Sequence, residues 1–150
     1  MSIKNAQMEA QNEVELKTNH KNLYKTIPYV LSEIKIDIPF NKEIQLFQLL
    51  RLLSPESYLL HLNRYRDTLV MVGHYICPEF EKIQALVSQL IYNLNHIPHL
   101  IIKAIYLHHQ LIRIHPFEDG NGRATRIAEN WILMYNLYAP TYIKNKKRNM

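Results

Sequence analysis

The chain is poor in the residues that build disulfide scaffolds, flexible linkers and membrane spans. Its 150 residues include one cysteine, three glycines and one tryptophan. A lone cysteine, Cys77, cannot form an internal disulfide, which excludes a disulfide-stapled secreted domain and favours the cytoplasm. No apolar run reaches the roughly 18 residues of a membrane span, and the first residues lack a signal-peptide pattern. We therefore expect a soluble protein with no membrane partner, although export as an effector stays open.

Helical spacing of apolar residues is what the sequence has in quantity. Residues 79–95, 41–53 and 99–113 carry apolar side chains at steps of three and four, the period of one helix face. After Gly122 the segment 127–138 is apolar on nearly every side, as expected for a central helix surrounded by others. The predicted fold class is therefore all-α, a helical bundle forming one domain.

One stretch departs from this spacing. In residues 66–75, β-branched side chains recur at every second position and stop at Gly73 and His74, a turn signal. We predict a small β-hairpin there, beside the helices.

The net charge of +5 and the pI near 9.3 could indicate a nucleic-acid partner. Much of the excess, however, lies at the end of the chain, in Lys144, Lys146, Lys147 and Arg148. We interpret residues 144–150 as a solvated basic tail and expect no nucleic-acid partner.

Two of the three glycines lie in one polar stretch, HPFEDGNGRATR, residues 115–126. It follows one predicted helix and opens the next, where unpaired N–H groups and the helix dipole favour an anion. Glycine lets the backbone approach that anion closely, so residues 120–122 predict a phosphate cradle. Arg123 and Arg126, three residues apart, can add forked donors on the same side.

The same stretch holds an acid and a base. Asp119, among phosphate-binding groups, is well placed to hold a divalent cation, most plausibly Mg²⁺ bridging polyphosphate oxygens. His115, with a reference pKa near 6.5, can be neutral and accept a proton from an attacking hydroxyl.

The stretch resembles the signature of the Fic family: His, any, Phe, any, Asp or Glu, Gly, Asn, Gly, Arg, any, any, Arg. Every defined position is matched. YLHHQLIRI (106–114) is similar to the helix that leads into the family's active loop, and RYRDTLVMVGHYICP (64–78) is similar to its hairpin flap. The resemblance covers roughly residues 40–143. It implies a Fic core at 36–143, with 1–35 as an N-terminal accessory segment.

The resemblance implies transfer of AMP from ATP to a Tyr, Thr or Ser hydroxyl of a target protein, releasing pyrophosphate. If the roles of the family's motif residues apply here, His115 is the base and Asp119 holds Mg²⁺. Phosphate binding falls to Gly120, Asn121, Gly122, Arg123 and Arg126. The flap would hold an extended target segment by strand addition, through Thr68, Leu69, Val70, Met71 and Val72.

Many relatives carry an inhibitory glutamate that pairs with the second arginine of the signature. In these relatives the inhibitory pattern is Ser or Thr, three variable residues, Glu, then Gly or Asn. TRIAEN (125–130) fits this pattern, but Glu129 shares a helix with Arg126, so we interpret the match as coincidence. NAQMEA (5–10), centred on Glu9, is a degenerate version. Inhibition is thus lost, or exerted imperfectly by Glu9, or supplied by a separate antitoxin-like protein.

Three alternatives stay open. The related Doc-like toxins phosphorylate their targets and carry a bulky Lys where this chain has Gly122, which favours nucleotidyl transfer here. Another nucleotide, or phosphocholine, could be the transferred group. A non-catalytic nucleotide-binding or interaction module is the third.

A zinc site at His108, His109 and His115 is disfavoured, because adjacent helical residues point to different faces.

Overall fold

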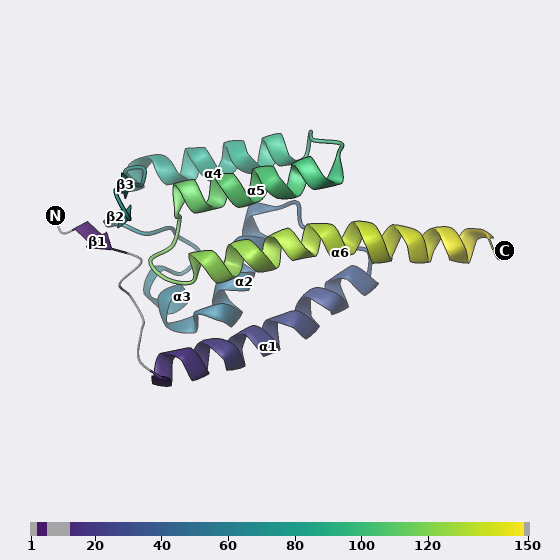
Figure 1. Ribbon diagram of the computed structural model, residues 1–150, viewed down its shortest axis with the longest axis horizontal. Helices are drawn as coiled ribbons and strands as arrows, with labels where there is room; N and C mark the ends of the chain where they lie inside the picture. Colours follow the sequence, from purple (N-terminus) through teal and green to yellow (C-terminus); the bar gives the residue numbers. More distant parts are fainter. Residues whose placement is uncertain (1–2, 6–12, 149–150) are drawn as a thin grey trace.

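The structure, a computed structural model, describes residues 3–5 and 13–148, and side chains over 13–137. Within these residues it contains six helices and three short strands (Figure 1). The helices are α1 (Glu13–Lys35), α2 (Glu43–Leu53), α3 (Pro55–His61), α4 (Phe80–Leu94), α5 (Leu100–Ile114) and α6 (Asn121–Arg148). The strands are β1 (Ile3–Asn5), β2 (Leu69–Val72) and β3 (Tyr75–Ile76).

The helices form a bundle around α6. α4 and α5 lie side by side as an antiparallel pair, α6 runs along α5, and α1 lies on the other side of α6 (Figure 1). The short α2 packs against both α1 and α6. The all-α fold class is therefore confirmed, and the loop between α5 and α6 emerges at one end of the bundle, beside the strands (Figure 1).

The core is centred on the first half of α6. Trp131 is fully buried, and its indole N–H donates a hydrogen bond to the Ile38 carbonyl at 3.0 Å. The rings of Tyr29 and Phe40 meet it edge-on, with centroids 6.1 and 5.6 Å away. Other fully buried residues are Leu46, Leu49, Leu53, Ile83, Val87, Leu94, Leu107 and Ala128. The prediction of a surrounded helix after Gly122 is thus confirmed over this part of α6.

Two predicted helices, 79–95 and 99–113, agree with α4 and α5 to within one residue at each end. The long α1 was not predicted. It packs against α2 and α6 and buries Thr26, Val30 and Ile34, so much of the segment expected as accessory belongs to the core.

The predicted hairpin is confirmed as β2 and β3, which pair antiparallel with Met71 opposite Ile76 and Val72 opposite Tyr75. The sheet has a third strand that the sequence did not predict. β1 pairs in parallel with β2, so the order is β1-β2-β3.

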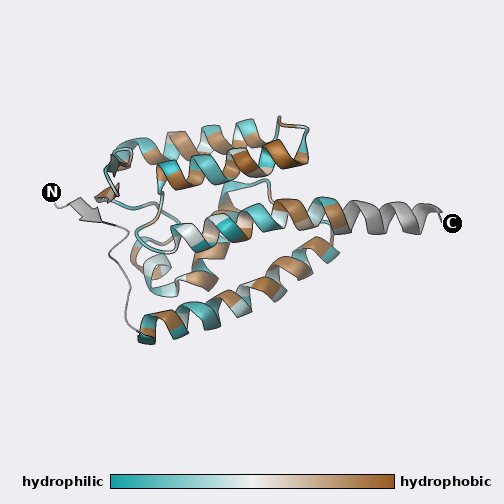
Figure 2. Ribbon diagram, viewed as in Figure 1, coloured by the Kyte–Doolittle hydropathy of each residue, from teal (hydrophilic) through white to brown (hydrophobic). Residues whose placement is uncertain are grey.

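Helices with side chains described carry apolar and polar segments in alternation, as amphipathic helices do (Figure 2). Over the part of the chain that the structure describes, no helix combines the length and apolar character needed to cross a bilayer.

The buried indole generates a stability prediction. Trp131→Phe removes the donor to the Ile38 carbonyl and leaves unfilled volume, so we expect a loss of about 2–3 kcal/mol in the free energy of unfolding. Urea unfolding followed by circular dichroism measures it. Tyr92→Phe, at a side chain that is 61% exposed, is the control and should change stability by less than about 0.5 kcal/mol. Equal effects of the two changes would contradict the central role of Trp131.

Candidate active site

The loop between α5 and α6 begins at His115, the C-cap of α5. His115 adopts a left-handed conformation, with φ 51° and ψ 62°, and its N–H donates to the Leu111 carbonyl at 2.9 Å. The left-handed cap turns the chain out of the helix. Pro116 follows immediately and cannot continue the helix.

Asn121 and Phe117 fix the shape of this loop. The Asn121 side chain accepts a hydrogen bond from the Phe117 N–H at 2.9 Å and donates one to the Phe117 carbonyl at 2.6 Å. The Phe117 ring is buried against Phe47 and Tyr65, with centroids 5.6 and 5.8 Å away. The side chain of Asn121 is therefore a brace, and only its backbone is available to an anion.

The two glycines of the loop have different surroundings. Gly120 has φ +85°, where other residues are strained, and a Cβ there would lie 3.3 Å from Leu50 Cδ1 and from Ser54 Cβ. A Cβ on Gly122 would instead lie 3.4 Å from Nη1 of Arg126. Gly120 makes the turn, whereas Gly122 leaves room for the second arginine of the motif.

The two arginines have different surroundings. Arg123 is 13% exposed and donates to Asn19 Oδ1 at 3.0 Å and to the Leu53 carbonyl at 2.8 Å, which connects α6 to α1 and α2. Arg126 is exposed, and within residues 13–137 it has no hydrogen bond or ion pair. Among the described side chains, Arg126 is thus the arginine of the motif that has no protein partner.

Asp119 borders a cavity of about 600 Å³ between the start of α1 and the α2–α3 junction. One of its oxygens, Oδ2, accepts a hydrogen bond from Ser54 Oγ at 3.0 Å and lies 3.4 Å from Nη2 of Arg123. The side chain is 49% exposed. A half-exposed carboxylate with an oxygen that accepts no hydrogen bond from the described residues fits the requirements of a Mg²⁺ ligand, and the cavity beside it is also lined by Glu15 and Glu56.

His115 lies in surroundings that keep it neutral. Burial and, second, the positive charge of Arg66 lower its pKa from 6.5 to about 4, while the Asp119 carboxylate opposes the shift. The imidazole is therefore unprotonated at neutral pH and can accept a proton.

Arg66 is a site residue that sequence reasoning missed. Arg66 is 2% exposed, and its guanidinium donates to four backbone carbonyls. The acceptors are His115 at 2.6 Å, Thr68 at 2.6 Å, Pro78 at 2.7 Å and Ile114 at 3.1 Å. The backbone N–H of Arg66 donates a fifth hydrogen bond, to the Pro116 carbonyl at 2.9 Å. Arg66 thereby fixes the end of α5 to both ends of the flap. A lone arginine before a strand gives no sequence signal for this role.

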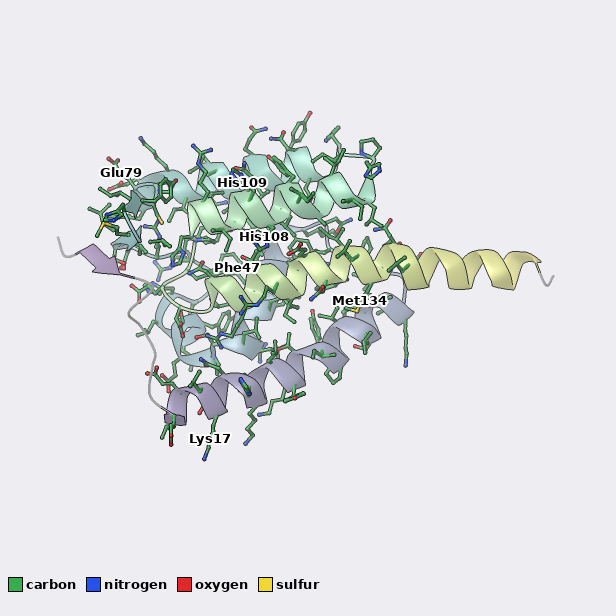
Figure 3. The ribbon with its side chains drawn as sticks, in the orientation of Figure 1. Lys17, Phe47, Glu79, His108, His109 and Met134 are labelled. Atoms are coloured by element: carbon green, nitrogen blue, oxygen red, sulfur yellow. The ribbon has the colours of Figure 1, made fainter. Side chains whose placement is uncertain are left out.

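Other charged groups flank the loop. His61 Nε2 lies 3.4 Å from Glu118 Oε2, and with Asp67 these residues offer ligand atoms within 4.8 Å of one another. His108 lies between α5 and α6 (Figure 3), where its Nδ1 is 2.9 Å from Glu129 Oε2. Glu129 therefore pairs across to α5, away from its own neighbour Arg126. Glu9, the other candidate inhibitory residue, lies outside the described residues.

The predicted docking residues 68–72 are β2 and the residue before it. Val70 is buried, and the Thr68 carbonyl accepts from Arg66. The edge of β2 that faces away from β3 is paired with β1. The single cysteine, Cys77, is buried behind the flap, and burial raises the pKa of its thiol, so it is packing.

Comparison with known proteins decides the family. The family model described as "Fic/DOC family" matches residues 12–133. The chain belongs to the Fic/DOC family. Proteins named "Protein adenylyltransferase Fic" from Culex quinquefasciatus and Nematostella vectensis are 36% and 35% identical over 91 and 97 residues, 58% and 62% of this chain. The chain spans only 18% and 23% of the length of these relatives.

Solved structures support the Fic fold. A Fic domain containing signaling protein from Bacteroides thetaiotaomicron has a TM-score of 0.69 at 23% identity, over 85% of this chain and 52% of that one. A Fic family protein from Desulfovibrio desulfuricans has a TM-score of 0.64 at 22% identity, over 83% and 38%. These similarities confirm the expected fold, and the family model confirms the expected family membership.

Arg66 generates a prediction in two variants. Arg66→Lys keeps the charge but cannot reach all four carbonyls, so we expect a loss of about 2–4 kcal/mol in the free energy of unfolding with the pKa of His115 still low. Arg66→Met removes the charge, so the pKa of His115 should rise part of the way from about 4 towards 6.5, because burial remains. Chemical unfolding and NMR titration of the imidazole measure these effects.

The exposed Arg113, near the end of α5, is the control. Arg113→Met should change neither quantity. A pKa of His115 that is the same in Arg66→Met and in the unmutated protein would show that the Arg66 charge does not act on the imidazole.

Proposed function

We propose that this chain carries a protein adenylyltransferase domain, which transfers AMP from ATP to a Tyr, Thr or Ser hydroxyl of a target protein and releases pyrophosphate. Family membership and the names of the relatives support a transferase. The observation that carries the proposal is the neutral His115, held at the end of α5 beside a helix N-terminus with an available arginine.

The first turn of α6 provides the proposed polyphosphate site. Its unpaired N–H groups and positive dipole end, at residues 120–122, favour an anion. Arg126 would contact the terminal phosphate with its forked donors, and Arg123 would add charge from a more fixed position. Asp119 would hold Mg²⁺, which when bound neutralises charge on the phosphates.

The proposed transfer uses His115 as general base. The target hydroxyl oxygen forms a bond to the α-phosphorus, and its proton passes to the free nitrogen of the imidazole. The bond between the α-phosphorus and the oxygen bridging to the β-phosphate breaks, and its electron pair leaves with pyrophosphate. Holding the phosphates at the end of α6 and the base at the end of α5 places the two reactants together.

A pKa of about 4 makes His115 neutral but a weak base. The negative charge of bound phosphates would raise this pKa towards neutrality, since nearby anions favour the imidazolium form. The base would therefore strengthen when the nucleotide is in place.

Gly122 separates this proposal from phosphorylation. A Cβ at position 122 would be in van der Waals contact with the Arg126 guanidinium, at 3.4 Å from Nη1, so a longer side chain there would compete with it for the same space. The related Doc-like toxins carry a Lys there, and with Gly122 the second arginine keeps its space for the terminal phosphate. The alternatives are a kinase, transfer of another nucleotide or of phosphocholine, and a binding module without chemistry. A separate antitoxin-like inhibitor, or inhibition by Glu9, would act on the same arginine.

The decisive experiment uses ATP labelled at the α- or at the γ-phosphate, incubated with the full chain, Mg²⁺ and cell lysate. We expect α-label on protein with the unmutated chain and a decrease of about 10²–10⁴-fold with His115→Ala, because the base is lost. ATP binding by His115→Ala, measured by calorimetry, should change little. His109→Ala, at an exposed histidine of α5 (Figure 3), is the control. Label only from γ-labelled ATP would indicate a kinase, and binding without labelling would indicate a binding module.

Replacing Arg126 and replacing Arg123 should have different effects on ATP binding and stability. Arg126→Ala should weaken ATP binding by roughly tenfold or more, through loss of a charge-assisted contact, without changing the melting temperature. Arg123→Ala should weaken ATP binding and also lower the melting temperature, because the contacts with Asn19 and Leu53 are lost. Calorimetry and thermal unfolding measure both. A destabilised Arg126→Ala, or an Arg123→Ala of unchanged stability, would contradict this division.

A further inference from the structure

The edge of the flap that is predicted to receive a target strand is paired with another part of the same chain. β1 runs parallel to β2, with Ile3 opposite Leu69, Lys4 opposite Val70 and Asn5 opposite Met71. Figure 1 shows β1 beside β2 and β3. The pairing therefore joins residues that are more than sixty positions apart in sequence.

Both edges of β2 are thereby used. One edge pairs with β3 through Met71 and Val72, and the other pairs with β1. A strand that adds to a sheet needs a row of unpaired N–H and C=O groups. An incoming segment can add to β2 only after β1 has left. The outer edge of β3 is the remaining place, and β3 has only the two residues Tyr75 and Ile76.

The β1 pairing is short enough to be displaced. It comprises three residue pairs, and strands of this length are marginal without further packing. Seven residues, 6–12, connect β1 to α1. Because β1 and β2 belong to the same chain, their pairing is intramolecular and does not depend on the protein concentration.

We propose that β1 acts as a built-in competitor, which occupies the target-docking edge of β2 and must be displaced by an extended segment of the target protein. The inference rests on the proposed function for the identity of the competing partner. Recognition is through backbone hydrogen bonds, so the class of occupant is an extended, unfolded peptide segment, with little dependence on its sequence.

The test uses two variants of the full chain that differ in one backbone N–H. Lys4→Pro removes the N–H and disturbs the parallel pairing, whereas Lys4→Ala changes the side chain and keeps the N–H. The first readout is independent of activity. Val70 faces β3, since its carbonyl accepts from the Cys77 N–H, so amide hydrogen exchange at residues 69 and 71 should be faster in Lys4→Pro and unchanged in Lys4→Ala. No acceleration in Lys4→Pro would overturn the proposal.

The second readout is the binding of a probe, a fluorescent peptide with the sequence of residues 1–10, followed by anisotropy. If the edge is open for roughly a tenth to a third of the time, the unmutated chain should bind the probe about three to ten times more weakly than Lys4→Pro does. Lys4→Ala should match the unmutated chain. Equal binding by Lys4→Pro and the unmutated chain would overturn the proposal.

The third readout is transfer of α-label from ATP to lysate proteins, which should increase about three- to tenfold in Lys4→Pro. Unchanged transfer with an opened edge would mean that targets dock elsewhere, for example on β3, and would overturn the competition. No transfer by any chain, together with faster exchange and tighter probe binding in Lys4→Pro, would reject the proposed function and support the occupancy of the edge by β1.

Discussion

The hydrogen bonds of the Arg66 guanidinium are the interaction on which the site depends. A buried charge costs several kcal/mol unless its donors are satisfied, and here four carbonyls accept them. Two of the carbonyls belong to the end of α5 and two flank the flap. One side chain therefore sets the position of the flap relative to His115, and its charge also lowers the pKa of that imidazole. Geometry and protonation state of the candidate base have the same origin.

The motif combines fixed and available groups. Asn121, Phe117 and Arg123 are held by protein contacts, so the loop keeps its shape in the absence of a ligand. Arg126 and half of the Asp119 side chain face solvent. A preformed cradle with a few available charges loses little conformational entropy on binding an anion.

The sequence predicted the parts that depend on local pattern. α4 and α5 each bury one face, so their apolar residues show a clear helical period. α1 was missed because exposed apolar residues such as Val14, Leu16 and Tyr24 blur its period. The roles of the motif residues were expected from local chemistry and the resemblance. The role of Arg66 was not, because its partners at positions 114 and 115 become neighbours only on folding. The pairing of β1 with β2 is non-local in the same way.

The contact between Arg123 and Asn19 has a thermodynamic consequence. Arg123 connects the first turn of α6 to α1, so the position of α1 and the freedom of this guanidinium are linked. Linkage is reciprocal, so if a ligand weakened the contact between Arg123 and Asn19, displacing α1 would favour binding of that ligand by the same factor. The start of α1 lines the cavity beside Asp119, so the position of this helix and the binding of a ligand in that cavity would be thermodynamically coupled.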